Sequence, residues 1–211
     1  MFVEIVDALR CPRPHEESWL VLAARRTDHR HVVEGTLGCP VCRAEYPIHE
    51  GVADFTDAAE HDRVFRQRVG ALSPADHLAA MLNLGDAHGF AVLIGAWGTR
   101  ADALLELLEA PPLLLVDPPR GIAMGHGLSG IRAGAMLPLA TGAARAVATD
   151  RAEPAGVAEA ARVARAGGRI VAPVESRVPQ DVRELARDEC VWVGERLPLP
   201  SAPITLHVRR G

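Results

Sequence analysis

The stretch of sequence that decides the fold is Ala161-Arg162-Val163-Ala164-Arg165-Ala166-Gly167-Gly168-Arg169-Ile170-Val171. It carries the end of a helix predicted over residues 155–165, two consecutive glycines, and an apolar strand predicted over residues 169–172. Gly167 can cap the helix because glycine adopts left-handed backbone angles without steric cost, and Gly168 then begins the strand. A helix that returns through a tight turn into an apolar strand is typical of an α/β sheet.

The same alternation of strand and helix begins near residue 91. Strands are predicted at 91–94, at 113–116, near Ile131 and at 145–148, with a helix at 102–108. Their apolar residues form continuous runs, which indicates parallel strands buried on both faces of one sheet.

The last part of the chain is predicted to close the sheet edge. A helix is expected over residues 179–187, followed by strands at 190–193 and 204–208 that can pair antiparallel. Cys190 is expected to be a small buried residue of the first of these strands, because Val191 and Val193 are its neighbours.

Composition restricts the class of protein. The 211 residues are 48% hydrophobic and include no lysine, and the formal net charge is -4. This balance does not favour nucleic acid as the main partner. No apolar run approaches the roughly 20 residues that span a bilayer, and Glu4 and Asp7 make the first ten residues unlike a secretory signal. A soluble cytoplasmic protein is expected.

The first 55 residues contain three of the four cysteines and predict a small β module with strands at 19–23 and 31–37. Cys39-Pro40-Val41-Cys42 is a pair at the spacing that directs two thiolates at one tetrahedral ion. Cys11-Pro12-Arg13-Pro14-His15 can form the facing turn, with His15 in place of a second cysteine. The predicted metal ligands are therefore Cys11, His15, Cys39 and Cys42, with zinc as the ion and His29 or His31 as alternative fourth ligands. The alternative is a metal-free module with three reduced thiols.

This module resembles a known family. The segments Leu9-Arg10-Cys11-Pro12, Gly38-Cys39-Pro40-Val41-Cys42, Tyr46-Pro47-Ile48 and Gly51-Val52-Ala53-Asp54-Phe55 resemble the small zinc-ribbon proteins that activate tRNA and protein methyltransferases. The resemblance covers about the first quarter of the chain. It implies a zinc ribbon and a surface for contact with a protein partner.

The α/β part resembles the class I S-adenosylmethionine-dependent methyltransferases. Val92-Leu93-Ile94-Gly95-Ala96-Trp97-Gly98-Thr99-Arg100 aligns without gaps on their first strand and glycine-rich turn, and residues 161–171 align on their fifth strand and the helix before it. Ile94 replaces an acid, Ala96 the first glycine and Arg100 the last. The resemblance implies a Rossmann-like, mostly parallel sheet with an antiparallel last strand.

The resemblance also implies where S-adenosylmethionine would bind. The implied cofactor residues are Gly95, Ala96, Trp97, Gly98 and Thr99 in the turn, Asp117 on the ribose hydroxyls, and Met136 and Leu137 beside the adenine. Arg100 could pair with a carboxylate or phosphate. Thr149 and Asp150 are candidates for substrate contact. Asp117 could instead be a solvated acid at a strand end, and Met136 and Leu137 could be core residues.

Three regions are predicted: a ribbon-like module at 1–55, a helical connector or lid at 56–89, and a methyltransferase-like domain at 90–211. Within the connector, Val64, Phe65, Arg68 and Leu72 share one helical face. Ser73-Pro74-Ala75-Asp76 predicts the start of a second helix.

Two functions are compatible with these patterns. One is an S-adenosylmethionine-dependent methyltransferase with its ribbon fused in cis, acting on an unknown small molecule or protein. The other is a pseudoenzyme, a methyltransferase-like scaffold or binding protein whose ribbon contacts a partner. Three altered positions in one cofactor turn favour the second. No catalytic residue can be named from the sequence.

Overall fold

The computed structural model describes residues 1–56, 72–85, 88–107, 112–125 and 127–198. The predicted helical face at Val64, Phe65 and Arg68 and the predicted strand at 204–208 lie outside these residues. No helix in the described ranges is long and apolar enough to cross a membrane.

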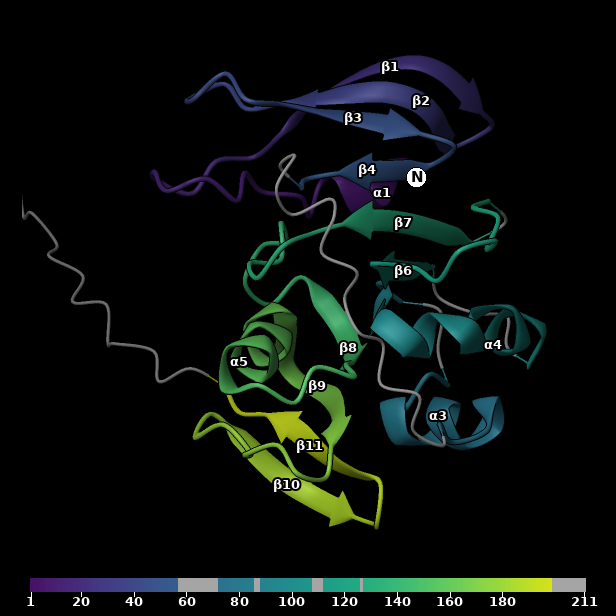
Figure 1. The fold of residues 1–211 in the computed structure, drawn as a ribbon, viewed down its shortest axis with the longest axis vertical. Helices are drawn as coiled ribbons and strands as arrows, with labels where there is room; N and C mark the ends of the chain where they lie inside the picture. The colour runs from purple at the N-terminus through teal and green to yellow at the C-terminus, as the bar shows by residue number, and fades with distance from the viewer. Residues whose placement is uncertain (57–71, 86–87, 108–111, 126, 199–211) are drawn as a thin grey trace, which may run out of the picture.

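One sheet of eleven strands runs through the described chain, in the order β1-β2-β3-β4-β7-β6-β5-β8-β9-β11-β10 (Figure 1). The strands are β1 (Val21–Asp28), β2 (His31–Gly38), β3 (Glu45–His49), β4 (Val52–Asp54), β5 (Ala91–Ile94), β6 (Leu113–Val116), β7 (Leu128–Arg132), β8 (Ala144–Ala148), β9 (Ala164–Pro173), β10 (Val182–Arg187) and β11 (Val191–Arg196). The helices are α1 (Val3–Val6), α3 (Ala75–Leu82), α4 (Ala101–Leu107) and α5 (Pro154–Val163), and η1 (Gly95–Arg100) is a 3₁₀ helix.

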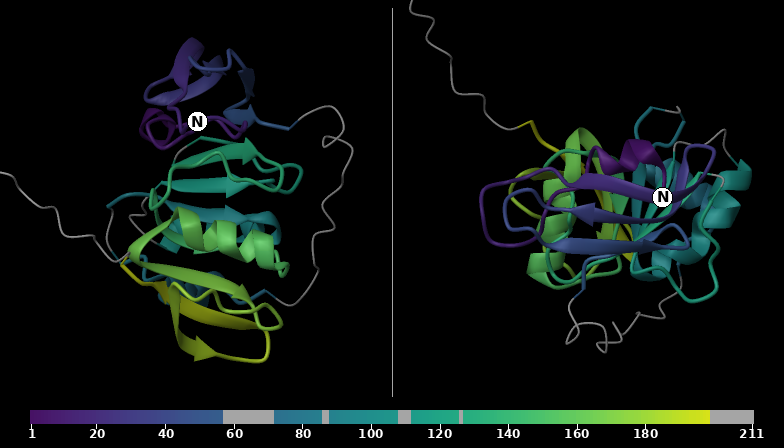
Figure 2. Two further views of the ribbon diagram at one scale, coloured as in Figure 1. Left: turned by 90° about the vertical axis from the view of Figure 1, so that its left-hand side faces the viewer. Right: turned by 90° about the horizontal axis from the view of Figure 1, so that it is seen from above.

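The centre of the sheet is parallel and its two ends are antiparallel. Strands β4, β7, β6, β5, β8 and β9 run parallel, whereas β11 pairs antiparallel with β9 and β10 with β11. Every residue of β5, β6 and β8 is buried. Helix α5 covers one face and helices α3 and α4 cover the other (Figure 2). The predicted mixed α/β sheet with parallel central strands is confirmed, but the sheet is larger than expected, because the antiparallel strands β1 to β3 extend it beyond β4.

The ribbon-like module is part of this same sheet. Its last strand, β4, pairs in parallel with β7, so that Val52 faces Gly130 and Asp54 faces Arg132. One core continues across the junction, from Ile48 in the module to Ile131 in β7. The division into three regions stays a prediction about which parts fold independently.

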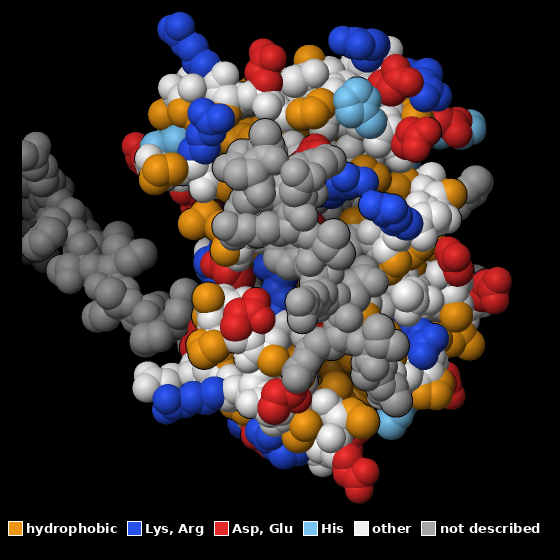
Figure 3. Space-filling view, viewed as in Figure 1, with side chains coloured by type: hydrophobic (Ala, Val, Ile, Leu, Met, Phe, Trp, Pro, Cys, Tyr) orange, Lys and Arg blue, Asp and Glu red, His pale blue; other side chains and the backbone are white. Residues whose placement is uncertain are grey.

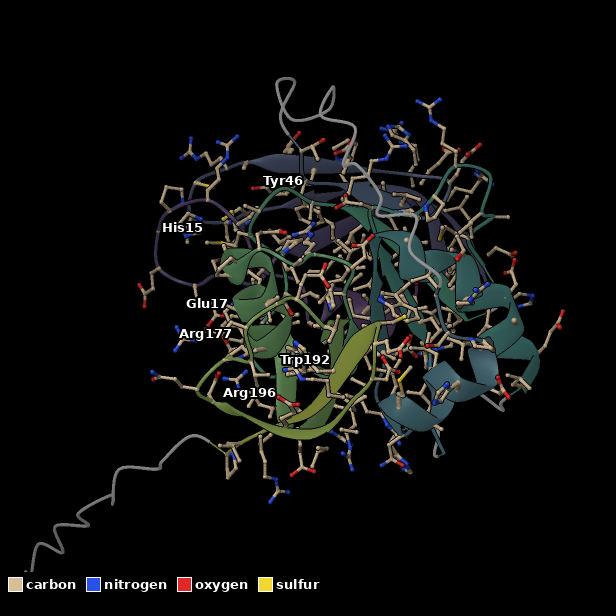
Figure 4. All side chains as sticks on the ribbon, turned by 60° about the horizontal axis from the view of Figure 1, so that its bottom comes forward. His15, Glu17, Tyr46, Arg177, Trp192 and Arg196 are labelled. Atoms are coloured by element: carbon tan, nitrogen blue, oxygen red, sulfur yellow. The ribbon has the colours of Figure 1, made fainter. Side chains whose placement is uncertain are left out.

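Two predictions for the last part of the chain are wrong. Residues 182–187 form strand β10 and not a helix, although Glu184, Leu185 and Ala186 favour helices, because pairing with β11 overrides local propensity. Cys190 is exposed between β10 and β11. Its neighbours Val191 and Val193 are buried as expected, and Trp192, labelled in Figure 4, is the largest buried side chain of β11. The expected helix after Pro74 is confirmed as α3, which begins at Ala75 without a side-chain cap.

Gly167 and Gly168 lie inside strand β9. Helix α5 ends at Val163 and the chain is already extended at Ala164, so Gly167 does not cap the helix. Gly167 has the expected positive φ, 74°, and lies where the pairing of β9 with β8 shifts register. Gly168 is tightly enclosed, because a Cβ there would lie 2.6 Å from the carbonyl oxygen of Arg145.

We expect Gly168→Ala to destabilise the protein more than Gly167→Ala. The first forces a methyl group against backbone atoms and should lower the free energy of unfolding by about 2–3 kcal/mol. The second meets no atom within 4 Å and should cost about 1 kcal/mol through its left-handed φ. Urea denaturation of both variants measures the difference, and the reverse order would contradict the assigned geometry.

Candidate functional site

The predicted cofactor residues lie at one edge of the sheet. The strand order reverses between β5 and β8, and ligands of open α/β sheets bind at the carboxyl ends of the strands beside such a reversal. The turn at 95–99 follows β5, Asp117 follows β6, residues 136–137 follow β7, and Asp150 follows β8. We call this edge the crevice.

The turn after β5 is packed into the protein. Ile94 is a core residue, and Trp97 is 2% exposed against α3 and α4. Thr99 donates its hydroxyl hydrogen bond to the carbonyl oxygen of Ala96, at 2.8 Å. A Cβ at Gly98 would lie 2.9 Å from the ring of Pro119. These contacts give the turn residues structural roles, and their contact with a cofactor stays a prediction.

Arg100 does not face an anion among the described residues. Its guanidinium donates to the carbonyl oxygens of Ser73 at 3.0 Å and Leu72 at 3.1 Å. The arginine therefore ties the start of α4 to the segment that precedes α3.

Asp150 occupies the space directly above Gly95. Its carboxylate accepts a hydrogen bond from the backbone N–H of Ala96 at 2.8 Å, and a Cβ placed on Gly95 would lie 2.3 Å from both carboxylate oxygens. Gly95 has a φ of 64°, which suits glycine. Burial raises the pKa of Asp150, and the hydrogen bond from Ala96 opposes that rise.

Asp117 is bound by residues that follow two other strands, β7 and β8. One carboxylate oxygen accepts from the N–H of Ala133 at 3.0 Å, and the other accepts from the guanidinium of Arg151 at 2.9 Å. The Asp117 and Arg151 side chains are 14% and 8% exposed, so Asp117 is not a solvated acid. Burial raises the pKa of Asp117, opposed by Ala133 and Arg151. Arg151 also donates to the carbonyl oxygen of Gly134 at 3.3 Å.

The two predicted adenine residues have opposite environments. Met136 is 55% exposed, whereas Leu137 is 2% exposed in the core. The N–H of Leu137 donates to Glu159 of α5 at 2.8 Å, and Arg162 donates to the carbonyl oxygen of Leu137 at 2.9 Å. This segment is therefore held on α5, and its contact with an adenine stays a prediction.

The four predicted metal ligands come together. The ligand atoms of Cys11, His15, Cys39 and Cys42 all lie within 4.8 Å of one another. The sulfurs of Cys11 and Cys42 are 3.7 Å apart, and the Cys39 sulfur is 3.4 Å from His15 Nε2. Two sulfurs on a tetrahedral zinc, each about 2.3 Å from the ion, would be about 3.8 Å apart. The donor set and spacing fit a tetrahedral metal.

Surrounding groups orient these ligands. His15 Nδ1 lies 2.6 Å from the carbonyl oxygen of Glu16, which leaves Nε2 directed at the cysteines. Burial opposes ionisation of Cys39, but the N–H groups of Cys42 and Val41 outweigh it and lower its pKa to about 6. Burial raises the pKa of Cys11, whose sulfur lies 3.2 Å from the Tyr46 hydroxyl (Figure 4).

The alternative fourth ligands lie elsewhere. His31 is buried, with Nε2 3.1 Å from the carbonyl oxygen of Leu128, and His29 is exposed beside Asp28. Neither belongs to the cluster formed by the described residues.

Sequence reasoning missed two residues of these sites, Arg151 and Tyr46. Arg151 directly follows the candidate Asp150, and its charge is complementary to Asp117, which was the available signal. Tyr46 lies in a segment that was quoted only as part of the ribbon pattern. Over the face shown in Figure 3, acidic and basic side chains are interspersed, in keeping with the low net charge.

Comparison with known proteins gives structural neighbours only. No family model matches the chain, and no curated protein sequence matches it. One neighbour is a chain of the complex between the Haloferax volcanii Trm112 methyltransferase activator and a protein named as a methyltransferase, with 19% identity, a TM-score of 0.40, and coverage of 46% of this chain and 50% of that chain.

Two further neighbours are methyltransferases. The tRNA (m1A58) methyltransferase TrmI from Aquifex aeolicus has 11% identity and a TM-score of 0.44, over 64% of this chain and 74% of that chain. Geranyl diphosphate C-methyltransferase from Streptomyces coelicolor A3(2) has 14% identity and a TM-score of 0.36, over 46% and 43%. This chain thus spans about half the length of the activator-complex chain and of the geranyl diphosphate enzyme.

We expect Arg151→Met to lower the free energy of unfolding by about 3–5 kcal/mol near neutral pH, because it leaves the Asp117 carboxylate buried without its cation. The pKa of Asp117 is higher in the folded protein than in the unfolded chain, so the folded protein binds a proton on this carboxylate more tightly. The free energy of unfolding therefore rises as the pH falls through the folded pKa. The destabilisation caused by Arg151→Met should accordingly be smaller in mild acid than at neutral pH.

The double variant Arg151→Met/Asp117→Asn is the control, since it removes both charges and should recover part of the loss. Denaturant unfolding of the three proteins at neutral and mildly acidic pH measures these effects. A loss that is independent of pH, or no recovery in the double variant, would contradict the buried ion pair.

Proposed function

We propose that this chain is a methyltransferase-fold protein without methyltransferase activity, and that it acts as a binding or scaffold protein stabilised by zinc in its ribbon. The single observation that carries the proposal is that the crevice is bridged by the protein's own side chains. Arg151 connects the end of β8 to Asp117 after β6, and Asp150 binds the turn after β5.

The residues of the crevice do not fit S-adenosylmethionine in this arrangement. Each oxygen of Asp117 already has a donor, and the charge-assisted hydrogen bond from Arg151 is about twice as strong as a neutral one, so ribose hydroxyls would have to compete with it. If Arg151 left Asp117, a buried cation would lose its carboxylate. Asp150 is likewise already bound to the Ala96 N–H in the turn that a cofactor would approach.

Ile94 supports the same proposal. In the family that the turn resembles, an acid at this position binds the methionine end of the cofactor. Here the side chain is 1% exposed within the core beneath α5, and it offers no hydrogen bond. We therefore derive no methyl-transfer step for this protein.

We expect neither S-adenosylmethionine nor S-adenosylhomocysteine to bind the wild-type protein with a Kd below about 1 mM, a free energy of about -4.1 kcal/mol. Isothermal titration calorimetry of zinc-loaded protein tests this. Arg151→Met should bind S-adenosylhomocysteine more tightly than wild type, because it frees Asp117. Arg165→Met, which changes an exposed arginine outside the crevice, is the matched control.

Micromolar binding to the wild type would contradict the proposal. Asp117→Ala would then show whether the cofactor uses the predicted ribose acid. Abolished binding would support a working methyltransferase site.

The metal part of the proposal is a structural zinc held by Cys11, His15, Cys39 and Cys42. Three thiolates and one imidazole are a known structural zinc set, and four protein ligands leave no open position for a substrate. Zinc would fix the segment before β1 to the turn between β2 and β3. In a small module this bond replaces part of the stability that a larger core would supply.

We expect about one zinc per chain in purified protein, measured by plasma mass spectrometry. Cys11→Ser should lose the metal, and His15→Ala should weaken zinc binding at least about tenfold, a loss of about 1.4 kcal/mol, in competition with a chromophoric chelator. Cys190→Ser removes the exposed cysteine outside the cluster and should keep one zinc. Full zinc affinity in His15→Ala would exclude His15 as a ligand.

A further inference from the structure

A cavity lies at the junction of the ribbon and the parallel sheet, apart from the crevice contacts and the metal cluster. Its volume is about 580 Å³, within the range of about 300–1,000 Å³ usual for small-molecule sites. Its walls come from Val33 in β2, His49 at the end of β3, Glu50 in the turn before β4, β4 itself, Arg132 at the end of β7, and residues 122–124. The cofactor residues predicted from the sequence do not line it.

The chain leaves this space open for a structural reason. The connection from β6 to β7 crosses one face of the sheet, and its described residues, 117–125 and 127, contain no helix. Ile122 and Met124 pack on the core beneath α3 and α4, which places the cavity on that face. Gly130 lets two lining side chains approach the β7 backbone closely, because a Cβ there would meet Val52 at 2.9 Å and Met124 at 3.2 Å.

The cavity combines an apolar wall with one available cation. Val52, Ile122 and Met124 supply apolar surface. Within the described ranges, the Arg132 guanidinium forms no hydrogen bond or ion pair. Asp54 lies beside Arg132 in register, yet its carboxylate accepts from the N–H of Thr56 at 2.9 Å and from the Thr56 hydroxyl at 2.6 Å. Arg132 is therefore left to bind an incoming anion.

Two acidic side chains that line the cavity, Glu50 and Asp54, limit the charge of an anion that Arg132 could bind. Glu50 lies in the turn before β4, at the opposite end of that strand from Asp54. The two carboxylates in the lining disfavour a multiply charged anion such as a nucleotide, whereas a single carboxylate can bind the planar fork of arginine with two parallel hydrogen bonds.

We propose that this cavity binds a small monocarboxylate with an apolar body, the carboxylate on Arg132 and the apolar body against Val52 and Met124. The site is independent of the crevice, so it can bind its ligand whether or not S-adenosylmethionine binds. It gives the binding role proposed above a specific ligand class.

The test uses hexanoate as the probe. Hexanamide is the uncharged control of the same length, and inorganic phosphate is the multiply charged control. Each is titrated into zinc-loaded, ¹⁵N-labelled full-length protein while amide shifts are followed. Hexanoate should shift the amides of Val52, Gly130 and Arg132 with a millimolar Kd, as expected for a ligand of this size. Hexanamide and phosphate should bind at least about tenfold more weakly.

Three variants locate the probe. Arg132→Gln should weaken hexanoate binding about tenfold by removing the charged donor. Ala123→Trp places a bulky side chain at an exposed position of the wall and should abolish binding by filling the cavity. Arg120→Gln changes an exposed arginine of the same connection that does not line the cavity, and it should leave the Kd unchanged.

The proposal is overturned if hexanoate causes no saturable shifts in folded wild-type protein, or if hexanamide binds as tightly. Equal affinity in Arg132→Gln, or tighter binding of phosphate, would also overturn it. Because S-adenosylhomocysteine is titrated separately, failure here is distinguishable from failure of the closed-crevice proposal.

Discussion

The parallel pairing of β4 with β7 is the interaction on which the arrangement of the whole protein depends. It joins a ribbon of four strands to an α/β sheet of seven, so that neither strand is left as an open edge. The pairing also brings Ile48 and Ile131 into one core. It also places β4 beside the connection from β6 to β7, and residues of both line the cavity at the junction.

The crevice shows how departures from a cofactor pattern can become structural contacts. Ile94 contributes to the core, the Ala96 N–H binds Asp150, and Arg100 holds the segment before α3. Each of these contacts gives a position that departs from the pattern a partner within the protein. Glycines that serve the fold are kept, because Gly98 lies against Pro119 and Gly168 against the backbone of β8.

The sequence predicts the strands whose side chains are buried on both faces of the sheet. It misses the element that forms a strand only because a neighbouring strand pairs with it. Strands β5 and β6 were predicted at their observed bounds from continuous apolar runs. Strand β10 was missed because Val182 is its only buried residue and its exposed residues carry helical propensity. The metal cluster was predictable because cysteine spacing constrains local geometry. Arg151 was missed despite its complementary charge, since its bond with Asp117 joins residues 34 positions apart and depends on the order of the strands.

The crevice and the cavity at the junction differ in the partners of their charged side chains. In the crevice, Asp117, Asp150 and Arg151 have partners within the protein, so a ligand would compete with buried contacts. At the junction, Asp54 is bound by Thr56, and Arg132 donates no hydrogen bond within the part of the chain that the structure describes. A buried cation with partners stabilises the fold, whereas a cation at the edge of an apolar cavity can bind an anion at little cost in desolvation. This contrast between Arg151, held on Asp117, and Arg132, at the edge of the cavity, is why we place the proposed carboxylate ligand at the junction and not in the crevice.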